Sequence, residues 1–337
     1  MTEDLRDYLR GCISTASIAD MCVSINEIGP FVSGLSISNP VSVSLLLYYT
    51  DVRVRRAAYH EFQIPKKSGG FRNILSPCGE LKEIMHTLAF ILKELYVATP
   101  PAMAYIAGKS IVDNACCHLG RNYVFNVDLS DFFPSITAMM VEHHLVKIGV
   151  SPLVATVIAT LCTYPTIIDH HVVNIVPQGA PTSPVISNIC ATTLDHRLSG
   201  LAKRFHLSYT RYADDITFSS NHNVYHPDGD FMIELCRIID ECHFTINRNK
   251  THLQKRGDRQ MVTGLLVCEK PNVGRKFIKD LRAHIHKIKF EEEPTLHDIN
   301  VVRGKLNFLR MVKGAEDTTY LSHIKKLNMA IKGKHFV

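Results

Sequence analysis

The chain has 337 residues, of which 46% are hydrophobic and 21% charged, so it can bury a substantial core divided into two or three packed units. With 18 Gly and 15 Pro it is not a collagen-like or low-complexity chain, and its longest apolar stretch, residues 153–162, is too short to span a membrane. The 10 Cys form no CxxC pair, which favours reduced thiols in a cytoplasmic protein.

Charge is distributed unevenly along the chain. Residues 1–245 contain 18 Lys and Arg against 23 Asp and Glu, whereas residues 246–337 contain 20 against 9. A basic C-terminal third favours a polyanionic partner, because each Lys or Arg that neutralises a phosphate releases condensed counterions. A solvated basic surface without a partner is the alternative, and charge alone does not decide between the two.

The N-terminal part predicts helices and one hairpin. Residues 1–50 predict helices broken by two Pro-containing loops. Residues 60–75 predict two strands around a Gly-Gly turn. Residues 80–97 predict a helix, because apolar side chains recur there every three or four positions. That apolar stripe indicates ordinary core packing.

The rest of the chain predicts strands alternating with helices. In chain order we expect a strand at 123–129, two helices within 137–163, a strand at 172–176, a helix over 185–201 and a hairpin over 207–219. Beyond residue 270 the sequence predicts basic helices with one apolar face, and we expect them to form a separate small domain.

Three aspartates are the strongest candidates for catalysis. Asp128 ends a predicted strand, and Asp214 and Asp215 lie at the tip of a predicted hairpin, all flanked by apolar residues. Carboxylates brought together on apolar strands repel one another, and Mg²⁺ resolves this conflict by accepting carboxylates together with substrate phosphates. Adjacent strand residues face opposite ways, so we expect Asp214 to act with Asp128 and Asp215 to lie further out. Simple solvation at a turn is the alternative.

Three motifs in this order resemble the palm of reverse transcriptases. They are DLSDFF at 128–133, QGAPTSP at 178–184 and YADD at 212–215. The resemblance extends from about residue 45 to about residue 315. It implies an α+β right-hand polymerase, with fingers, a palm whose antiparallel sheet packs on helices, and a small helical thumb.

The resemblance also divides the chain into parts. It implies an N-terminal helical region at 1–50, fingers and palm elements at 51–122 and 137–176, the palm with the catalytic carboxylates at 123–136 and 177–268, and a basic helical thumb at 269–337. In this family two Mg²⁺ ions, for which Mn²⁺ can substitute, would be held by Asp128, Asp214, Asp215 and the backbone carbonyl of Leu129.

Five residues correspond to the family's contacts with the incoming deoxynucleoside triphosphate. The resemblance implies that Arg72 contacts the triphosphate, with Lys67 in an accessory phosphate role, and that Gln178 contacts the nucleotide. Phe133 takes the position that excludes a ribose 2′-hydroxyl, and Lys250 lies near the phosphates. The alternatives are a solvated turn lysine at 67, a core phenylalanine at 133 and plain charge neutralisation at 250.

Two shorter motifs resemble signatures of retron reverse transcriptases. NACCH at 114–118 resembles their NAxxH motif, and VTG at 262–264 resembles the motif that helps recognise their RNA. The resemblance implies RNA contacts at Asn114, His118, Val262, Thr263 and Gly264, and at Arg303 and Lys305 in the thumb, since A-form duplexes are recognised mainly through shape, 2′-hydroxyls and phosphates. A buried core histidine is the alternative at position 118.

The resemblance implies a specific activity. A retron enzyme copies part of its own structured noncoding RNA into single-stranded DNA, starting from a guanosine 2′-hydroxyl, and yields a branched RNA–DNA hybrid called msDNA. Such systems often act with an effector protein in defence against phage, and no membrane is involved. Two alternatives stay open. One is another bacterial reverse transcriptase, group II intron-like or diversity-generating, and the other is a non-catalytic RNA-binding scaffold with a polymerase fold.

Overall fold

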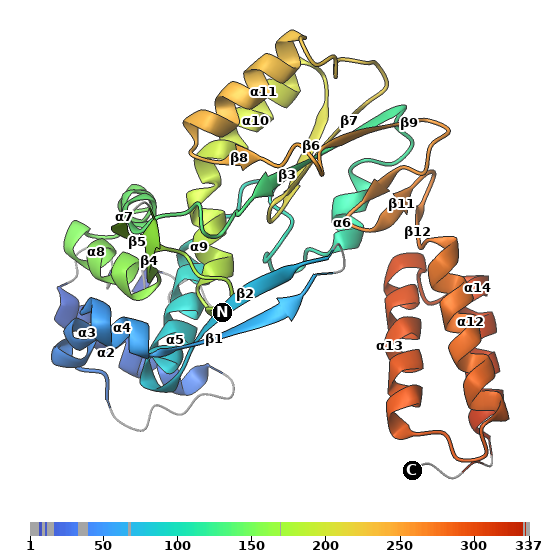
Figure 1. Ribbon diagram of the computed structural model, residues 1–337, viewed down its shortest axis with the longest axis horizontal. Helices are drawn as coiled ribbons and strands as arrows, with labels where there is room; N and C mark the ends of the chain where they lie inside the picture. Colours follow the sequence, from blue (N-terminus) through green and yellow to red (C-terminus); the bar gives the residue numbers. More distant parts are fainter. Residues whose placement is uncertain are drawn as a thin grey trace.

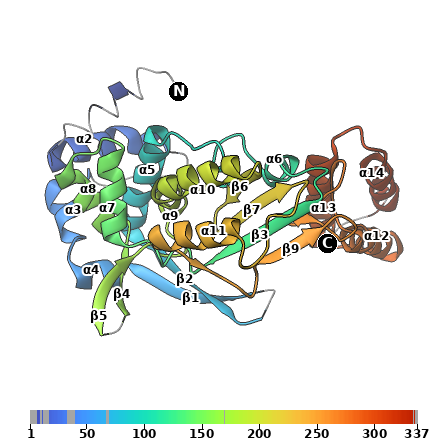
Figure 2. The same cartoon turned by 90° about the horizontal axis from the view of Figure 1, so that it is seen from above.

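The computed structural model describes residues 7–8, 11, 17–32, 40–66, 69–168, 170–332 and 334. Figures 1 and 2 show an elongated molecule with a helical region at the N-terminal end, an antiparallel sheet in the middle and three long helices at the C-terminal end. The α+β class that the sequence predicts is confirmed.

The N-terminal elements follow the predicted order. They are α2 (Ile18–Ile28), the 3-10 turn η1 (Gly29–Phe31), α3 (Val43–Tyr48), α4 (Val52–Ala57), the antiparallel hairpin β1 (Tyr59–Pro65) and β2 (Phe71–Pro77), and α5 (Gly79–Leu95). The Ser17 side chain caps α2 together with Asp20. The apolar stripe of α5 is buried in the main core, as its periodicity predicts.

A second group of elements comes before and after the first strand of the central sheet in the chain. It consists of α6 (Ile111–Cys116), α7 (Ala138–Lys147), α8 (Pro152–Leu161) and the hairpin of β4 (Tyr164–Ile168) with β5 (His171–Ile175). The two helices predicted within 137–163 are confirmed. The strand predicted at 172–176 is also present, and its partner β4 is an addition that the sequence pattern did not indicate.

The central sheet positions the candidate catalytic residues. Its strands are β3 (Tyr123–Ser130), β6 (Ser208–Tyr212), β7 (Asp215–Ser220), β8 (Thr245–Ile246) and β9 (His252–Lys255). They run in the order β6-β7-β3-β8, β9 also pairs with β3, and all neighbouring pairs are antiparallel. No residue of β3 is exposed and five of the six residues of β7 are buried, so both faces of this part of the sheet are largely covered.

Helices α9 (Ser183–Cys190), α10 (Thr192–Arg204) and α11 (Asp230–Glu241) belong to the same core as this sheet. Figure 2 shows α10 and α11 lying across it. The prediction of a single helix over 185–201 is wrong, because the segment divides at Ala191. The Thr192 hydroxyl donates to the backbone carbonyl of Asn188, and back-bonding of this kind bends helices.

The C-terminal part has its own hydrophobic core. It contains the small sheet of β10 (Met261–Val262), β11 (Leu265–Val267) and β12 (Pro271–Asn272), and the helices α12 (Arg275–Phe290), α13 (Leu296–Lys313) and α14 (Thr318–Ile331). The basic helices predicted beyond residue 270 are present, and they are three in the described part of the chain. The second core also includes Ala115 of α6 and Val124 of β3, so it begins well before residue 270.

Candidate active site

Strand register brings the predicted catalytic aspartates together. Asp128, near the end of β3, lies directly opposite Asp215, the first residue of β7, and the backbone N–H of Leu129 donates to the carbonyl of Asp214 at 3.1 Å. Directly opposed residues of an antiparallel pair project from the same face of the sheet. Two carboxylates from distant parts of the sequence therefore point to one side of the sheet.

The different roles predicted for Asp214 and Asp215 stay predictions, because the register fixes backbone positions only. The strand pairing sets the backbone of Asp215 opposite Asp128, and Asp214 precedes it in the turn. In the same turn Ala213 has a left-handed backbone with φ 57°. Asp214 remains within the same electrostatic environment, half-buried in the turn.

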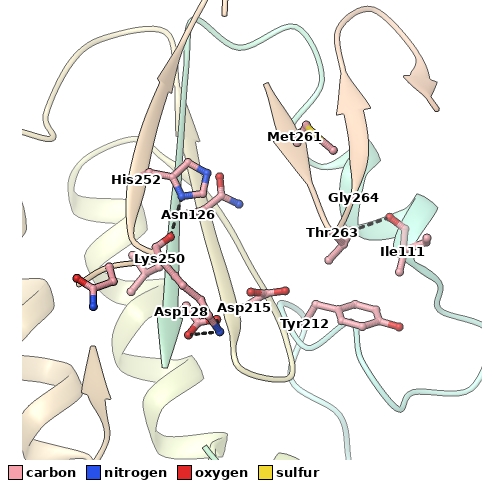
Figure 3. Close-up of a pocket in the computed structure, with 12 residues that line it drawn as sticks. Ile111, Asn126, Asp128, Tyr212, Asp215, Lys250, His252, Met261, Thr263 and Gly264 are labelled. Atoms are coloured by element: carbon pink, nitrogen blue, oxygen red, sulfur yellow. Dashed lines mark hydrogen bonds and ion pairs between the residues drawn. The ribbon is translucent and has the colours of Figure 1, made fainter. Parts of the chain in front are cut away.

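These carboxylates lie at a pocket of about 700 Å³ (Figure 3). Its wall is formed by strand residues of the central sheet, by the loop before β9 and by the β10–β11 turn. The lining residues are Ile111, Asn126, Val127, Asp128, Tyr212, Asp215, Asn249, Lys250, His252, Met261, Thr263 and Gly264. The pocket thus adjoins the candidate catalytic residues on one side and the VTG motif on the other.

The carboxylates make one another harder to ionise. Burial, followed by the charges of Asp214 and Asp128, raises the pKa of Asp215 to about 6, although its side chain still reaches solvent at the pocket. Burial and the charge of Asp128 also raise the pKa of Asp214. Lys250 opposes both shifts. Its ammonium lies 3.1 and 3.3 Å from the two carboxylate oxygens of Asp128 (Figure 3).

This donor set fits magnesium that is shared with a substrate. Among the described residues, no three His, Cys, Asp or Glu side chains converge into a complete metal site. Mg²⁺ is commonly held by one or two carboxylates together with substrate phosphates and waters. Asp128 and Asp215, with Asp214 close by, supply that number of carboxylates, and the salt bridge to Lys250 indicates that a positive charge is accommodated beside Asp128.

Two of the predicted nucleotide contacts, Arg72 and Gln178, lie on β2 and on the QGAP loop. Arg72 on β2 is exposed, and its charge lowers the pKa of Asp214, which places it on the side of the catalytic turn. The carbonyl of Gln178 accepts a hydrogen bond from the Leu75 N–H at 2.8 Å, so the QGAP loop is attached to the strand that carries Arg72. Lys67 lies outside the described residues.

Phe133 and Lys250 have partners of their own. Phe133 is half-buried and packs edge-on against Phe132, with ring centroids 5.5 Å apart, so it belongs to the edge of the core while keeping some exposure. Lys250, predicted near the nucleotide phosphates, forms its ion pair with Asp128. Its side chain is 57% exposed, so a phosphate could reach the same ammonium.

The two polar residues of the NAxxH-like motif are buried, whereas Cys116 and Cys117 between them are exposed. Asn114 and His118 are both 0% exposed. The His118 ring lies 2.7 Å from the hydroxyls of Ser219 and Thr210, and Thr210 donates to Asn114. Direct RNA contact by Asn114 or His118 is therefore wrong for this arrangement. The alternative of a core histidine is the one that the structure supports, and burial lowers the pKa of His118 to about 3.

The VTG motif is divided between the core and the pocket. Val262 is buried in the second core, which contradicts a direct RNA contact by its side chain. Thr263, with φ 46°, and Gly264 form the turn that lines the pocket (Figure 3). Asn114 donates to the Thr263 hydroxyl at 3.4 Å. This hydrogen bond joins the buried Asn114 of the NAxxH-like motif to the VTG turn at the pocket.

The two RNA contacts predicted in the thumb differ in their exposure and in their ion pairs. Arg303 is exposed on α13. Lys305 is half-buried, and its ammonium forms an ion pair with Asp280 and lies 3.2 Å from Nδ1 of His284. Phosphate binding by Lys305 would have to compete with Asp280.

Sequence reasoning missed two sets of residues at this site. Tyr212 and His252 line the pocket, and the available signal was that Tyr212 begins the YADD motif and His252 follows Lys250 by two residues. Arg211 and Asp195 form a fully buried ion pair behind the catalytic turn. An arginine in a strand that leads into the YADD motif was the available signal for that pair, because a charge buried in a sheet requires a buried partner.

Comparisons with known proteins identify the family of the chain. Residues 64–291 match the family described as reverse transcriptase (RNA-dependent DNA polymerase). The chain is 35% identical to the retron Mx65 reverse transcriptase of Myxococcus xanthus, over 81% of this chain and 66% of that protein. It is 32% identical to the retron Ec86 reverse transcriptase of Escherichia coli, over 85% of each. In the part of the chain that the structure describes, no helix is long and apolar enough to cross a membrane.

Proposed function

Because the chain belongs to the retron-type family of reverse transcriptases, which are RNA-dependent DNA polymerases, we propose that it copies part of its own structured noncoding RNA into single-stranded DNA. The product would be the branched RNA–DNA hybrid msDNA. The observation that carries this proposal is the register of β3 against β7, which sets Asp128 opposite Asp215 at a pocket. Deoxynucleoside triphosphates and the cognate RNA are the proposed substrates.

Two magnesium ions are part of the proposal, with manganese as a substitute. Asp128, Asp215 and Asp214 would hold them, together with the carbonyl of Leu129 and the phosphates of the nucleotide. When bound, this pair of ions would activate the attacking hydroxyl and stabilise the departing pyrophosphate. Lys250, already beside Asp128, would neutralise charge on the phosphates or donate a proton to pyrophosphate.

The incoming nucleotide would lie between the central sheet and the β1–β2 hairpin. Arg72 would bind the triphosphate, Gln178 would contact the nucleotide, and Phe133 would exclude a ribose. The attachment of the QGAP loop to β2 supports this arrangement, because it keeps Arg72 and Gln178 in one unit. In this proposal the fingers, palm and thumb have the boundaries that the sequence predicts.

The proposed cellular setting is a cytoplasmic retron that defends its host against phage together with an effector protein. This part rests on the resemblance to retron enzymes. The nine cysteines that the structure describes are all free thiols, which suits a reducing compartment.

A matched set of variants tests the catalytic role. Asp128→Asn and Asp215→Asn should each reduce deoxynucleotide incorporation on the co-purified RNA by about a thousandfold or more, because each removes charge from the site that would hold the metal, while RNA binding is kept. Asp131→Asn is the control, since this residue lies three positions from Asp128, is exposed, and has a left-handed backbone that asparagine tolerates. Wild-type rates in both test variants would refute the catalytic assignment.

A second experiment separates the alternatives. The nucleic acid that co-purifies with the protein would be sequenced, and a covalent RNA–DNA branch would identify retron-type synthesis. Activity on a DNA-primed template without branched product would favour another bacterial reverse transcriptase. No incorporation by the wild type on its own RNA with Mg²⁺ would favour the scaffold.

A further inference from the structure

A buried ion pair lies directly behind the catalytic turn. Arg211 on β6 and Asp195 on α10 both have side chains that are 0% exposed. Their contact is bidentate, with Nε of Arg211 2.7 Å from Oδ1 of Asp195 and the Nη2 nitrogen 2.7 Å from Oδ2. Thr99 and Tyr209 donate further hydrogen bonds to the same carboxylate, at 2.6 and 2.8 Å. The position of the guanidinium is therefore fixed on one side.

The third guanidinium nitrogen of Arg211 points towards the catalytic residues. Nη1 lies 3.3 Å from the carbonyl oxygen of Ala213 and 3.2 Å from Oδ1 of Asn188. The Ala213 carbonyl belongs to the peptide bond that joins Ala213 to Asp214. Only one residue then separates this hydrogen bond from Asp215.

The turn needs such a support. Ala213 has φ 57°, a left-handed conformation that is unfavourable for a residue with a Cβ. Conformations of this kind persist where the surrounding structure holds them in place. The backbone of Arg211 is itself held, because its N–H donates to the carbonyl of Pro101 at 2.8 Å and its carbonyl accepts from the N–H of Met103 at 2.9 Å.

Stability alone is a weak explanation for this arrangement. Taking two charges out of water costs about as much as their attraction returns, so a buried ion pair is weak evidence for stability. What the ion pair contributes is defined geometry, because a planar guanidinium with five donors fixes the positions of its acceptors. Here the acceptors are a helix carboxylate on one side and the catalytic turn on the other.

We propose that Arg211, held by Asp195, is a positioning residue that fixes the Ala213 turn and so keeps Asp215 opposite Asp128. The proposal rests on the proposed role of these carboxylates in metal binding. Arg211 does not touch substrate, since it is fully buried. It acts through the peptide carbonyl of Ala213.

Two variants test this role. Arg211→Lys keeps the charge, but a single ammonium cannot bind both oxygens of Asp195 and also reach the Ala213 carbonyl. The double variant Arg211→Met with Asp195→Leu removes both charges, so no unpaired charge remains buried. Tyr209→Phe is the control, because it removes one hydrogen bond to Asp195 and leaves both the turn and the stacking on Phe218 at 5.0 Å unchanged.

Each purified full-length variant would be measured for its thermal midpoint, for kcat and KM of nucleotide incorporation, and for Mn²⁺ binding by electron paramagnetic resonance. We expect both test variants to lose about 10- to 100-fold in kcat, because a small displacement of a catalytic group is enough for this. Mn²⁺ binding should weaken, while KM for the nucleotide stays within about twofold. Tyr209→Phe should keep kcat within about twofold of the wild type.

The opposite result would overturn the proposal. If Arg211→Lys and the double variant lower the thermal midpoint but keep wild-type kcat and Mn²⁺ binding, the ion pair serves packing alone. Failure of the proposed function is distinguishable, since it would appear as wild-type synthesis by Asp215→Asn whatever the behaviour of Arg211.

Discussion

A methyl group at position 179 should separate the QGAP loop from the β1–β2 hairpin. Gly179 has φ +121°, and a Cβ there would lie 2.7 Å from Cγ2 of Ile74 and 2.9 Å from the carbonyl oxygen of Leu75. The backbone conformation costs an alanine about 1–3 kcal/mol, and overpacking costs about 1–3 kcal/mol more. Because part of the clash can relax, we expect Gly179→Ala to reduce the free energy of unfolding by about 3 kcal/mol.

The same change should affect substrate binding more than chemistry. Displacement of β2 stretches the hydrogen bond from Leu75 to Gln178 and moves Arg72, which lies on that strand. We expect KM for the deoxynucleotide to rise several-fold, with a smaller change in kcat. Urea denaturation and steady-state incorporation measure the two effects.

Gly200→Ala is the matched control for this substitution. Gly200 lies within α10, and a Cβ added there would meet no neighbouring atom within 4 Å, so alanine should fit and stabilise the helix by about 1 kcal/mol. Opposite signs are therefore expected for the same chemical change at two glycines. Unchanged stability and unchanged KM in Gly179→Ala would refute the close approach of the loop and the hairpin.

Three further predictions follow from charges. Lys250→Met should move the acidic limb of the pH–rate profile to higher pH, because the Lys250 ammonium lowers the pKa of Asp214 and Asp215. In the proposed mechanism these two carboxylates act in their ionised form, so an acidic limb at unchanged pH would contradict the prediction. His118 has a pKa of about 3 in the folded protein, so its contribution to stability is present above about pH 6.5 and is lost as the pH falls. In urea titrations, the free energy of unfolding should therefore change less between pH 7 and pH 5 in His118→Asn than in the wild type, and an equal change would contradict this. Arg303→Ala should reduce the slope of log RNA affinity against log salt concentration by about 1. Lys305→Ala should reduce this slope by less, because Lys305 already pairs with a carboxylate, and equal reductions in the two variants would contradict this reasoning.

The central hairpin was predictable from sequence, and its register was not. Alternating apolar residues on either side of the YADD motif predict two strands with acids between them. Which aspartate faces Asp128 depends on one backbone conformation, the left-handed turn at Ala213. Alanine gives no sign of that conformation, because glycine, asparagine and aspartate are the residues that typically adopt it. The sequence therefore indicates that the two aspartates lie at the hairpin tip, but not how the turn presents each of them to Asp128.

Buried polar networks are a second limit of sequence reasoning. Asn114 and His118 look like surface recognition residues, since polar side chains are usually exposed. Their partners Thr210 and Ser219 come from strands far along the chain, and only the fold brings them together. Once all donors and acceptors are paired, burial is no longer costly. Sequence alone could not tell these residues from ligands of an RNA.

The same network relates the RNA motif to the candidate catalytic residues. Thr263 at the pocket contacts Asn114, Asn114 accepts from Thr210, and Thr210 lies on β6, which leads into the catalytic turn. The second core also contains residues of α6 and β3 as well as the thumb helices. A packed core resists deformation, so a displacement of the VTG turn would be resisted by the strands that hold the aspartates. The sequence suggests a small C-terminal domain separate from the rest, whereas one shared core joins its helices to the VTG strand and to Val124 of β3.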